Sequence, residues 1–113
     1  MTVSTHVLDA GRGGPGQGIT VALSRRAAEG TPGLAGDWRA VESGVTDADG
    51  RLRFASDTPA GTYRLAFATG PYFTAWAVVA FYPEVTIAFT VTEGHFHVPL
   101  LLSPYAYSTY RGS

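Results

Sequence analysis

Large apolar residues alternate with polar or small residues in three stretches of the chain. In residues 84–91 the apolar side chains fall on every second position, with Glu, Thr, Ala and Thr between them. The same spacing occurs in residues 17–25 and 61–68. When the period is two residues, successive side chains point to opposite faces of a strand, so one face packs into a core while the other meets solvent or a partner. The pattern predicts a β-strand in each stretch.

Glycine- and proline-rich sequences separate these predicted strands. They occupy residues 11–18, residues 29–37 and the Asp-Gly pair at residues 49–50. Glycine supplies the backbone conformations that tight turns need, and Asp-Gly is a common hairpin turn. Short strands with turn signals at intervals of about ten residues indicate a β-sandwich or a barrel.

Residues 71–78 (PYFTAWAV) depart from the alternation. Their bulky side chains lie at positions 72, 73 and 76, a spacing that suits a short helix with Pro71 in its first turn. No repeat or low-complexity segment marks a second domain. We therefore expect residues 1–113 to form a single all-β domain with one short helix.

Composition and charge exclude several classes of function. The net charge is −1, and the basic residues are all arginines, spread from Arg12 to Arg111 without clustering. This distribution argues against a nucleic-acid partner. The chain has neither cysteine nor lysine, which excludes a thiol nucleophile, a cysteine-ligated zinc and a lysine Schiff base.

No apolar run approaches the ~18 to 20 residues of a membrane span, and a strand-like segment follows Met1 where a secretion signal would lie. We expect a cytoplasmic protein with no membrane partner.

The histidines are the first candidates for chemistry. His95 and His97 are two positions apart in a strand-like segment, so their imidazoles share a face. His-x-His on a strand is a pattern of metal ligands, and His6 would supply a third ligand for zinc. An imidazole pKa of about 6.5 also suits acid–base catalysis. Ordinary hydrogen-bonded strand histidines are the third alternative, and the pattern leaves all three open.

Residues 46–51 (TDADGR) allow two interpretations. They resemble the start of a calcium loop but lack its later ligands, so a hairpin turn is preferred, with Arg51 beginning the next strand. The planar guanidinium of Arg51 could bind a carbonyl or carboxylate group, although a solvated surface arginine is the simpler alternative. Residues 11–16 are glycine-rich but precede a strand rather than a helix, so we expect a loop and no phosphate site.

Three motifs occur in a characteristic order: residues 4–9 (STHVLD), residues 46–51 (TDADGR) and residues 97–113, which end in Tyr-Arg-Gly-Ser. Together they resemble the 5-hydroxyisourate hydrolases, the transthyretin-related enzymes of purine catabolism. The resemblance runs from Ser4 to Ser113. It implies a transthyretin-like two-sheet β-sandwich, with residues 71–78 as its short helix. It also implies a homotetramer, a dimer of dimers with active sites in a channel between the dimers.

The resemblance implies a reaction as well. This is the hydrolytic opening of 5-hydroxyisourate to 2-oxo-4-hydroxy-4-carboxy-5-ureidoimidazoline in urate degradation, by histidine-activated water, without a covalent intermediate, cofactor or metal. The implied catalytic residues are His6, Arg51 and His97. The implied substrate-binding residues are Tyr110, Arg111, Gly112 and Ser113, which would close the site. Transthyretin, a carrier, has other residues in place of both histidines and the arginine, so a ligand carrier without turnover is the alternative.

Overall fold

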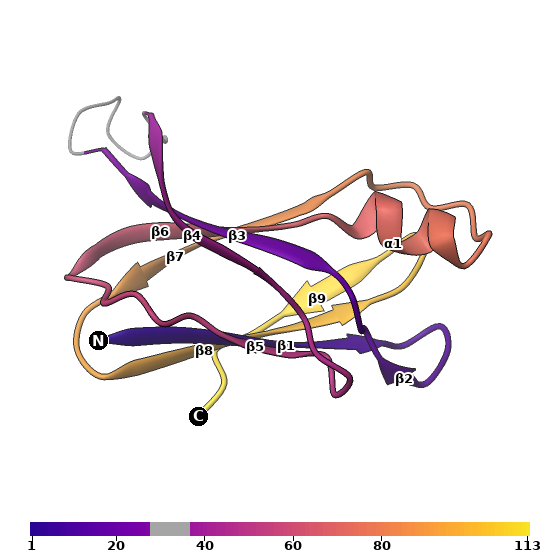
Figure 1. Ribbon diagram of the computed structural model, residues 1–113, viewed down its shortest axis with the longest axis horizontal. Helices are drawn as coiled ribbons and strands as arrows, with labels where there is room; N and C mark the ends of the chain where they lie inside the picture. The colour runs from indigo at the N-terminus through magenta and orange to yellow at the C-terminus, as the bar shows by residue number, and fades with distance from the viewer. Residues whose placement is uncertain (28–36) are drawn as a thin grey trace.

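The computed structural model describes residues 1–27 and 37–113, which form two β-sheets packed face to face and one short helix (Figure 1). The first sheet contains β1 (Thr2–Asp9), β2 (Gly14–Pro15), β5 (Arg51–Arg53), β8 (His95–Leu102) and β9 (Tyr107–Thr109). The second sheet contains β3 (Thr20–Arg26), β4 (Trp38–Val45), β6 (Gly61–Phe67) and β7 (Val85–Val91). The helix is α1 (Thr69–Ala75). The expected all-β sandwich with one short helix is confirmed.

Alternating apolar side chains form the core between the two sheets. In the second sheet, Val21 lies opposite Phe67 and Leu23 opposite Leu65, and all four are buried. The three stretches with a period of two are β3, β6 and β7, as the sequence predicts. Removing this apolar surface from water is the main force that holds the sheets together.

The first sheet is built around β1, the strand nearest the N-terminus. β8 pairs with one edge of β1 and runs parallel to it, while β5 and β2 pair with the other edge and run antiparallel to it. Val3 and Val7 point into the core, and Ser4 and His6 belong to the opposite face, as their alternation predicts. Strands from the beginning, middle and end of the chain therefore lie side by side on one outer surface.

The turn at residues 46–50 connects the two sheets. Gly50 has a φ of 77°, and a Cβ there would lie 2.3 Å from the carbonyl oxygen of Val7, so glycine is required. Arg51 begins β5, as expected. The hairpin prediction is wrong in one respect, because β4 belongs to the second sheet and β5 pairs with β1 instead.

The glycine-rich segment before β3 is not entirely loop. A turn follows β1, and then Gly14 and Pro15 pair with Asp9 and Leu8 as β2, which corrects the expectation of a loop throughout. Among the residues predicted to form the other glycine-rich turn, 29–36 lie outside the described part of the chain.

The helix begins and ends earlier than predicted, at Thr69 rather than Pro71 and at Ala75 rather than Val78. The first backbone N–H groups of a helix have no partner within it, so Pro71 is tolerated inside the first turn. The helix stops because Ala77 adopts a φ of 55°, and the N–H groups of Ala77 and Val78 donate back to Thr74 and Phe73. No helix among the described residues has the length and hydropathy needed to span a membrane.

Candidate active site

Three strands of the first sheet bring the predicted catalytic residues onto one face. His6 on β1 lies opposite Arg51 on β5, and Ser4 on β1 lies opposite His97 on β8. Residues paired across strands point to the same side of a sheet, and so do positions i and i+2 along one strand. His6, Arg51 and His97 therefore share the outer face, away from the core.

Two open cavities flank Arg51 on this face. One, of about 450 Å³, is lined by Ser4, Thr5, Asp47, Arg51, Leu52, Arg53, His95, His97 and Ser113. The other, of about 540 Å³, is lined by His6, Leu8, Gly13, Gly14, Pro15, Asp49 and Arg51. The predicted residues thus divide between neighbouring cavities, with Arg51 belonging to both.

The last residues of the chain run beside β8 and contact His97. The Gly112 N–H donates to the His97 carbonyl oxygen at 2.8 Å. A Cβ on Gly112 would lie 2.6 Å from Cδ2 of the imidazole, so the ring packs directly against this glycine. Ser113 lines the His97 cavity, and the Arg111 guanidinium lies 4.5 Å from the centre of the Phe96 ring. Tyr110 is exposed.

His6 is held by the turn that precedes Arg51. Its Nε2 lies 2.9 Å from the Asp49 carbonyl oxygen. A carbonyl can only accept a hydrogen bond, so the network assigns a proton to Nε2 and leaves Nδ1 as the lone-pair nitrogen of the neutral ring. The Asp47 carboxylate fixes the turn by accepting from the N–H groups of Asp49 and Arg51 at 2.9 and 3.0 Å. The Arg51 N–H also keeps the pKa of this carboxyl below its ordinary value.

His97 lies in a different environment. Burial lowers its pKa below the ordinary value, and nearby His6, His95 and Arg51 lower this pKa further. A lowered pKa keeps the imidazole neutral at neutral pH, which is the form that accepts a proton. The Nδ1 atom of His97 lies 2.8 Å from the hydroxyl oxygen of Ser4, so Nε2 is the nitrogen left for water or a ligand.

Ser4 and Asp47 are contacts of the site that sequence reasoning missed. Ser4 touches His97 only because β1 and β8 pair in parallel. Asp47 belongs to the TDADGR motif, and an Asp at the start of a turn is a recognisable signal for a side chain that caps backbone N–H groups.

The zinc interpretation requires His6, His95 and His97 around one point. In the part of the chain that the structure describes, no group of three or more His, Cys, Asp or Glu side chains is arranged to hold a metal ion. His95 and His97 contact Ser4, while His6 contacts the Asp49 carbonyl. Two of the histidines thus share Ser4 as a hydrogen-bond partner, while His6 is held at a separate place by the turn.

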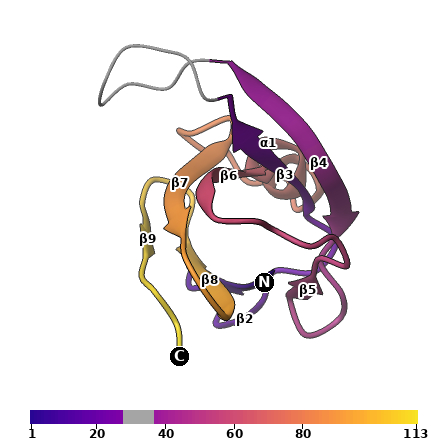
Figure 2. The ribbon, with the colours of Figure 1, turned by 90° about the vertical axis from the view of Figure 1, so that its left-hand side faces the viewer.

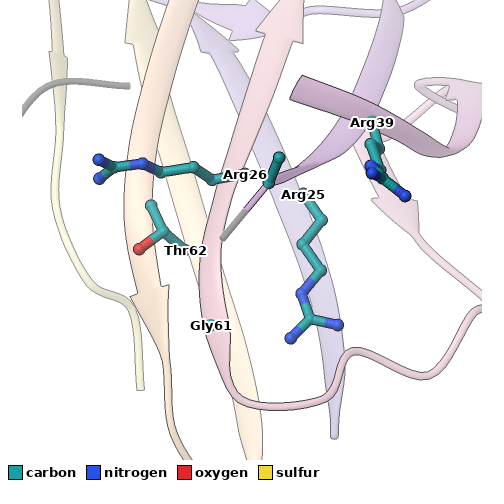
Figure 3. A pocket seen from close by; sticks show the side chains of 6 residues that line it. Arg25, Arg26, Arg39, Gly61 and Thr62 are labelled. Atoms are coloured by element: carbon teal, nitrogen blue, oxygen red, sulfur yellow. The ribbon is translucent and has the colours of Figure 1, made fainter. Parts of the chain in front are cut away.

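A larger hollow lies on the second sheet. It has a volume of about 640 Å³ and is lined by Arg25, Arg26, Ala27, Arg39, Gly61 and Thr62 (Figure 3). Figure 3 shows the guanidinium groups of Arg25 and Arg26 pointing in different directions. The charged side chains in this lining are all arginines, whose guanidinium groups donate hydrogen bonds and cannot accept a proton from water. The hollow offers no base or acid for hydrolysis, so the face with the histidines is the better candidate.

Comparison with known proteins identifies the family. The model of the HIUase/Transthyretin family matches residues 3–112. The chain belongs to this family. It is 45% identical to the 5-hydroxyisourate hydrolase of Caulobacter vibrioides, an alignment that covers 98% of this chain and 97% of the relative. Its identity to the Mus musculus 5-hydroxyisourate hydrolase is 42%, over 98% of this chain and 94% of the relative.

Solved hydrolases and solved transthyretins of this family both share the fold of this chain. The 5-hydroxyisourate hydrolase of Klebsiella pneumoniae superimposes with a TM-score of 0.85 at 37% identity, covering 100% of both chains. Sea bream transthyretin in complex with thyroxine also gives a TM-score of 0.85, at 31% identity, over 97% of this chain and 93% of that chain. The transthyretin-like sandwich is therefore confirmed, but the fold by itself does not separate an enzyme from a carrier.

Proposed function

We propose that this protein hydrolyses 5-hydroxyisourate to 2-oxo-4-hydroxy-4-carboxy-5-ureidoimidazoline in urate degradation. The observation that carries the proposal is the placement of His6, Arg51 and His97 on one outer face of the first sheet. The chain is also 37 to 45% identical to relatives named 5-hydroxyisourate hydrolase, and 30 to 31% identical to solved transthyretins.

The reaction needs three functions from the site. Water attacks a ring carbonyl, and the adjacent C–N bond breaks. A base must take a proton from the water, an acid must protonate the leaving nitrogen, and a donor must stabilise the negative charge that develops on the carbonyl oxygen. Direct attack by water fits a chain that lacks cysteine and lysine.

His97 acts as the base in this proposal. Its lowered pKa favours the neutral ring, and its Nε2 is left for water while Nδ1 contacts Ser4. His6 acts as the acid: its Nε2–H bond to the Asp49 carbonyl persists when the ring gains its second proton at Nδ1, and this Nδ1 proton is the one given to the leaving nitrogen. Arg51, shared by both cavities, orients the substrate and stabilises charge on its oxygens.

We also propose that the last four residues bind substrate and close the site. They are Tyr110, Arg111, Gly112 and Ser113. The contact of Gly112 with His97 and the position of Ser113 in the cavity support this role.

A homotetramer built as a dimer of dimers is the proposed assembly. β7 and β9 are edge strands of the two sheets and lie on the same side of the sandwich (Figure 2). Exposed edges offer unpaired backbone groups to another copy. Next to them lies an aromatic patch, which we define as Phe81, Tyr82, Tyr105 and Tyr107; Phe81 is 70% exposed and Tyr105 66%. The single domain and the cytoplasmic location stay predictions, and the core shared by both sheets supports the former.

The test is to generate 5-hydroxyisourate from urate with urate oxidase and to follow its ultraviolet decay. We expect the protein to accelerate the decay well above the spontaneous rate, with or without EDTA. A decay unchanged by the protein would indicate a carrier, and an acceleration lost to EDTA would indicate a metal enzyme.

Substitutions at the site sharpen this test. His6→Asn and His97→Asn should each lower kcat by roughly 10² to 10⁴-fold, the usual contribution of acid–base catalysis. Arg51→Gln should lower kcat/KM, whereas Arg39→Gln on the second sheet should not. Unchanged turnover in folded His6 and His97 variants would contradict the assignment.

A further inference from the structure

A line of hydrogen bonds leads from His97 to Thr2, the first residue of β1. The Ser4 hydroxyl oxygen lies 2.8 Å from Nδ1 of His97 and 2.8 Å from Nε2 of His95. The other nitrogen of His95, Nδ1, lies 2.6 Å from the Thr2 hydroxyl oxygen. The parallel register of β1 and β8 places these four side chains in two adjacent pairs on one face.

Ser4 couples the two histidines because its hydroxyl has a single proton. It can donate to one imidazole only, so the other imidazole must donate its own N–H to the oxygen. Two arrangements satisfy both contacts. In the first, Ser4 donates to Nδ1 of His97, whose proton is then on Nε2. In the second, Ser4 donates to His95, and His97 donates its Nδ1–H to Ser4.

Only the second arrangement makes neutral His97 a base toward the cavity. There the lone pair is on Nε2, while Nδ1 carries the proton and is held by Ser4. His95 must then accept from Ser4 at Nε2 and carry its own proton on Nδ1, where the Thr2 oxygen accepts it. The proton position on His95 therefore determines the proton position on His97.

The surroundings of Ser4 favour a defined hydrogen-bond pattern. Ser4 is buried, with 9% of its surface exposed, so water has little access to the contact. No carboxylate among the described residues takes the place of Ser4 at Nδ1 of His97. The orienting role that a carboxylate performs for many reacting histidines falls here to a neutral hydroxyl and a second imidazole.

We propose that Ser4 and His95 are positioning residues that hold His97 with its proton on Nδ1 and its lone pair on Nε2. This inference rests on the proposed function, since it states how the base of that reaction is prepared. When Nε2 takes a proton from water, hydroxide is left to attack the carbonyl, and His97 becomes an imidazolium that still donates from Nδ1 to Ser4.

The proton positions on the histidine rings can be measured in the free protein, independently of turnover. Side-chain ¹⁵N NMR of histidine-labelled protein distinguishes a protonated ring nitrogen from one with a lone pair. We expect wild-type His97 to carry its proton on Nδ1 above its pKa. Ser4→Ala and His95→Phe should both shift His97 toward the form protonated on Nε2. Wild-type His97 protonated on Nε2 would overturn the proposal.

Kinetics give the second measurement. Ser4→Ala and His95→Phe should lower kcat about 10- to 100-fold, the range known for partners that orient ligating imidazoles, with KM changed less than about twofold. Ser4→Thr keeps a hydroxyl and should recover most of the lost kcat. Ser24→Ala removes a strand serine from the second sheet and serves as the matched control with unchanged kcat.

The outcomes separate this proposal from the proposed function. Wild-type protein that fails to accelerate 5-hydroxyisourate decay would refute the function, and the NMR measurement would still decide whether Ser4 and His95 set the proton position. Folded Ser4→Ala and His95→Phe variants with wild-type kcat and unchanged His97 signals would overturn the positioning role. His95 is exposed, so its substitution keeps the test valid if Ser4→Ala folds poorly.

Discussion

Gly112 lies so close to the ring of His97 that no side chain fits between them. A Cβ would lie 2.6 Å from Cδ2 of the imidazole. Gly112→Ala must therefore move the ring or the terminal segment, and a displacement of about 1 Å at a catalytic group costs up to 10²-fold in rate. We expect kcat to fall at least tenfold while the melting temperature changes little, because residue 112 lies outside the sheets' core.

Gly18 provides a control, because its substitution should change stability rather than turnover. Gly18 has a φ of 79°, and a Cβ there would meet no atoms within 4 Å, so Gly18→Ala strains the backbone without touching the site. It should lower the melting temperature and leave kcat unchanged. If Gly112→Ala instead behaves like Gly18→Ala, the contact with His97 has no part in turnover.

The lowered pKa of His97 makes the free energy of unfolding depend on pH. The unfolded chain has an ordinary imidazole with a pKa of about 6.5, while burial and nearby charges lower the pKa in the folded state. The unfolded state thus binds more protons, so the free energy of unfolding falls as pH decreases from about 6.5 through the lowered pKa. Urea unfolding between pH 7.5 and 5 should show a steeper loss for wild type than for His97→Asn. Parallel curves would exclude a lowered pKa at His97.

Among the secondary-structure elements, the strands were predictable where alternation is strong. β3, β6 and β7 follow from their apolar periods because one face of each must be buried. Alternation also shows that Ser4 and His6 share a face. It does not show which strands become neighbours, and the pairing of β1 with β8 joins residues from opposite ends of the chain. The contact of Ser4 with both His95 and His97 depends on this pairing, so it could not be predicted.

The limits of α1 were not predictable for a local reason. Ala77 ends the helix with a positive φ of 55°, a role usually filled by glycine. The sequence AWAV contains no such signal, so the predicted helix continues to Val78.

The catalytic assignment of His6, Arg51 and His97 came from motifs rather than from periodicity, and it stays a prediction until the variants are measured.

Ala77 gives a test at the scale of this helix. A left-handed backbone costs roughly 1 kcal/mol for a residue with a side chain, and glycine avoids this cost. Ala77→Gly should therefore raise the free energy of unfolding by roughly 0.5 to 1 kcal/mol. Ala75→Gly, the same change at an exposed helical position, should lower it by a similar amount because glycine is a poor helix former. Urea unfolding that gives both variants the same sign would contradict the account of the helix end.

At the scale of the whole molecule, the site faces outward. Its residues lie on the surface of the first sheet that points away from the core, and the cavities beside Arg51 are open. Reactions of this kind benefit from a site that excludes bulk water. A second copy over this face would provide the missing walls, which connects activity to the proposed tetramer.

Phe81 provides the last prediction, which concerns assembly. Its ring lies 4.9 Å from that of Tyr82, which lies 5.3 Å from that of Tyr107 on the edge strand β9, so these three members of the aromatic patch are in contact with one another. Phe81→Ser should remove apolar contact area between copies and shift the sedimentation mass from four chains toward smaller species. Val45→Ser is the matched control, because Val45 is 54% exposed on β4, at the opposite edge of the second sheet. It should keep the wild-type mass and activity.

Dissociation and activity should change together if copies of the chain complete the site. We expect Phe81→Ser to lower kcat/KM most strongly at low protein concentration and to recover part of the loss as concentration rises, by mass action. Circular dichroism should show that the sandwich remains, since Phe81 lies outside the buried core. A wild-type protein that sediments as one chain would refute the tetramer. A dissociated Phe81→Ser variant with full activity would show instead that the contact made by the aromatic patch does not complete the site.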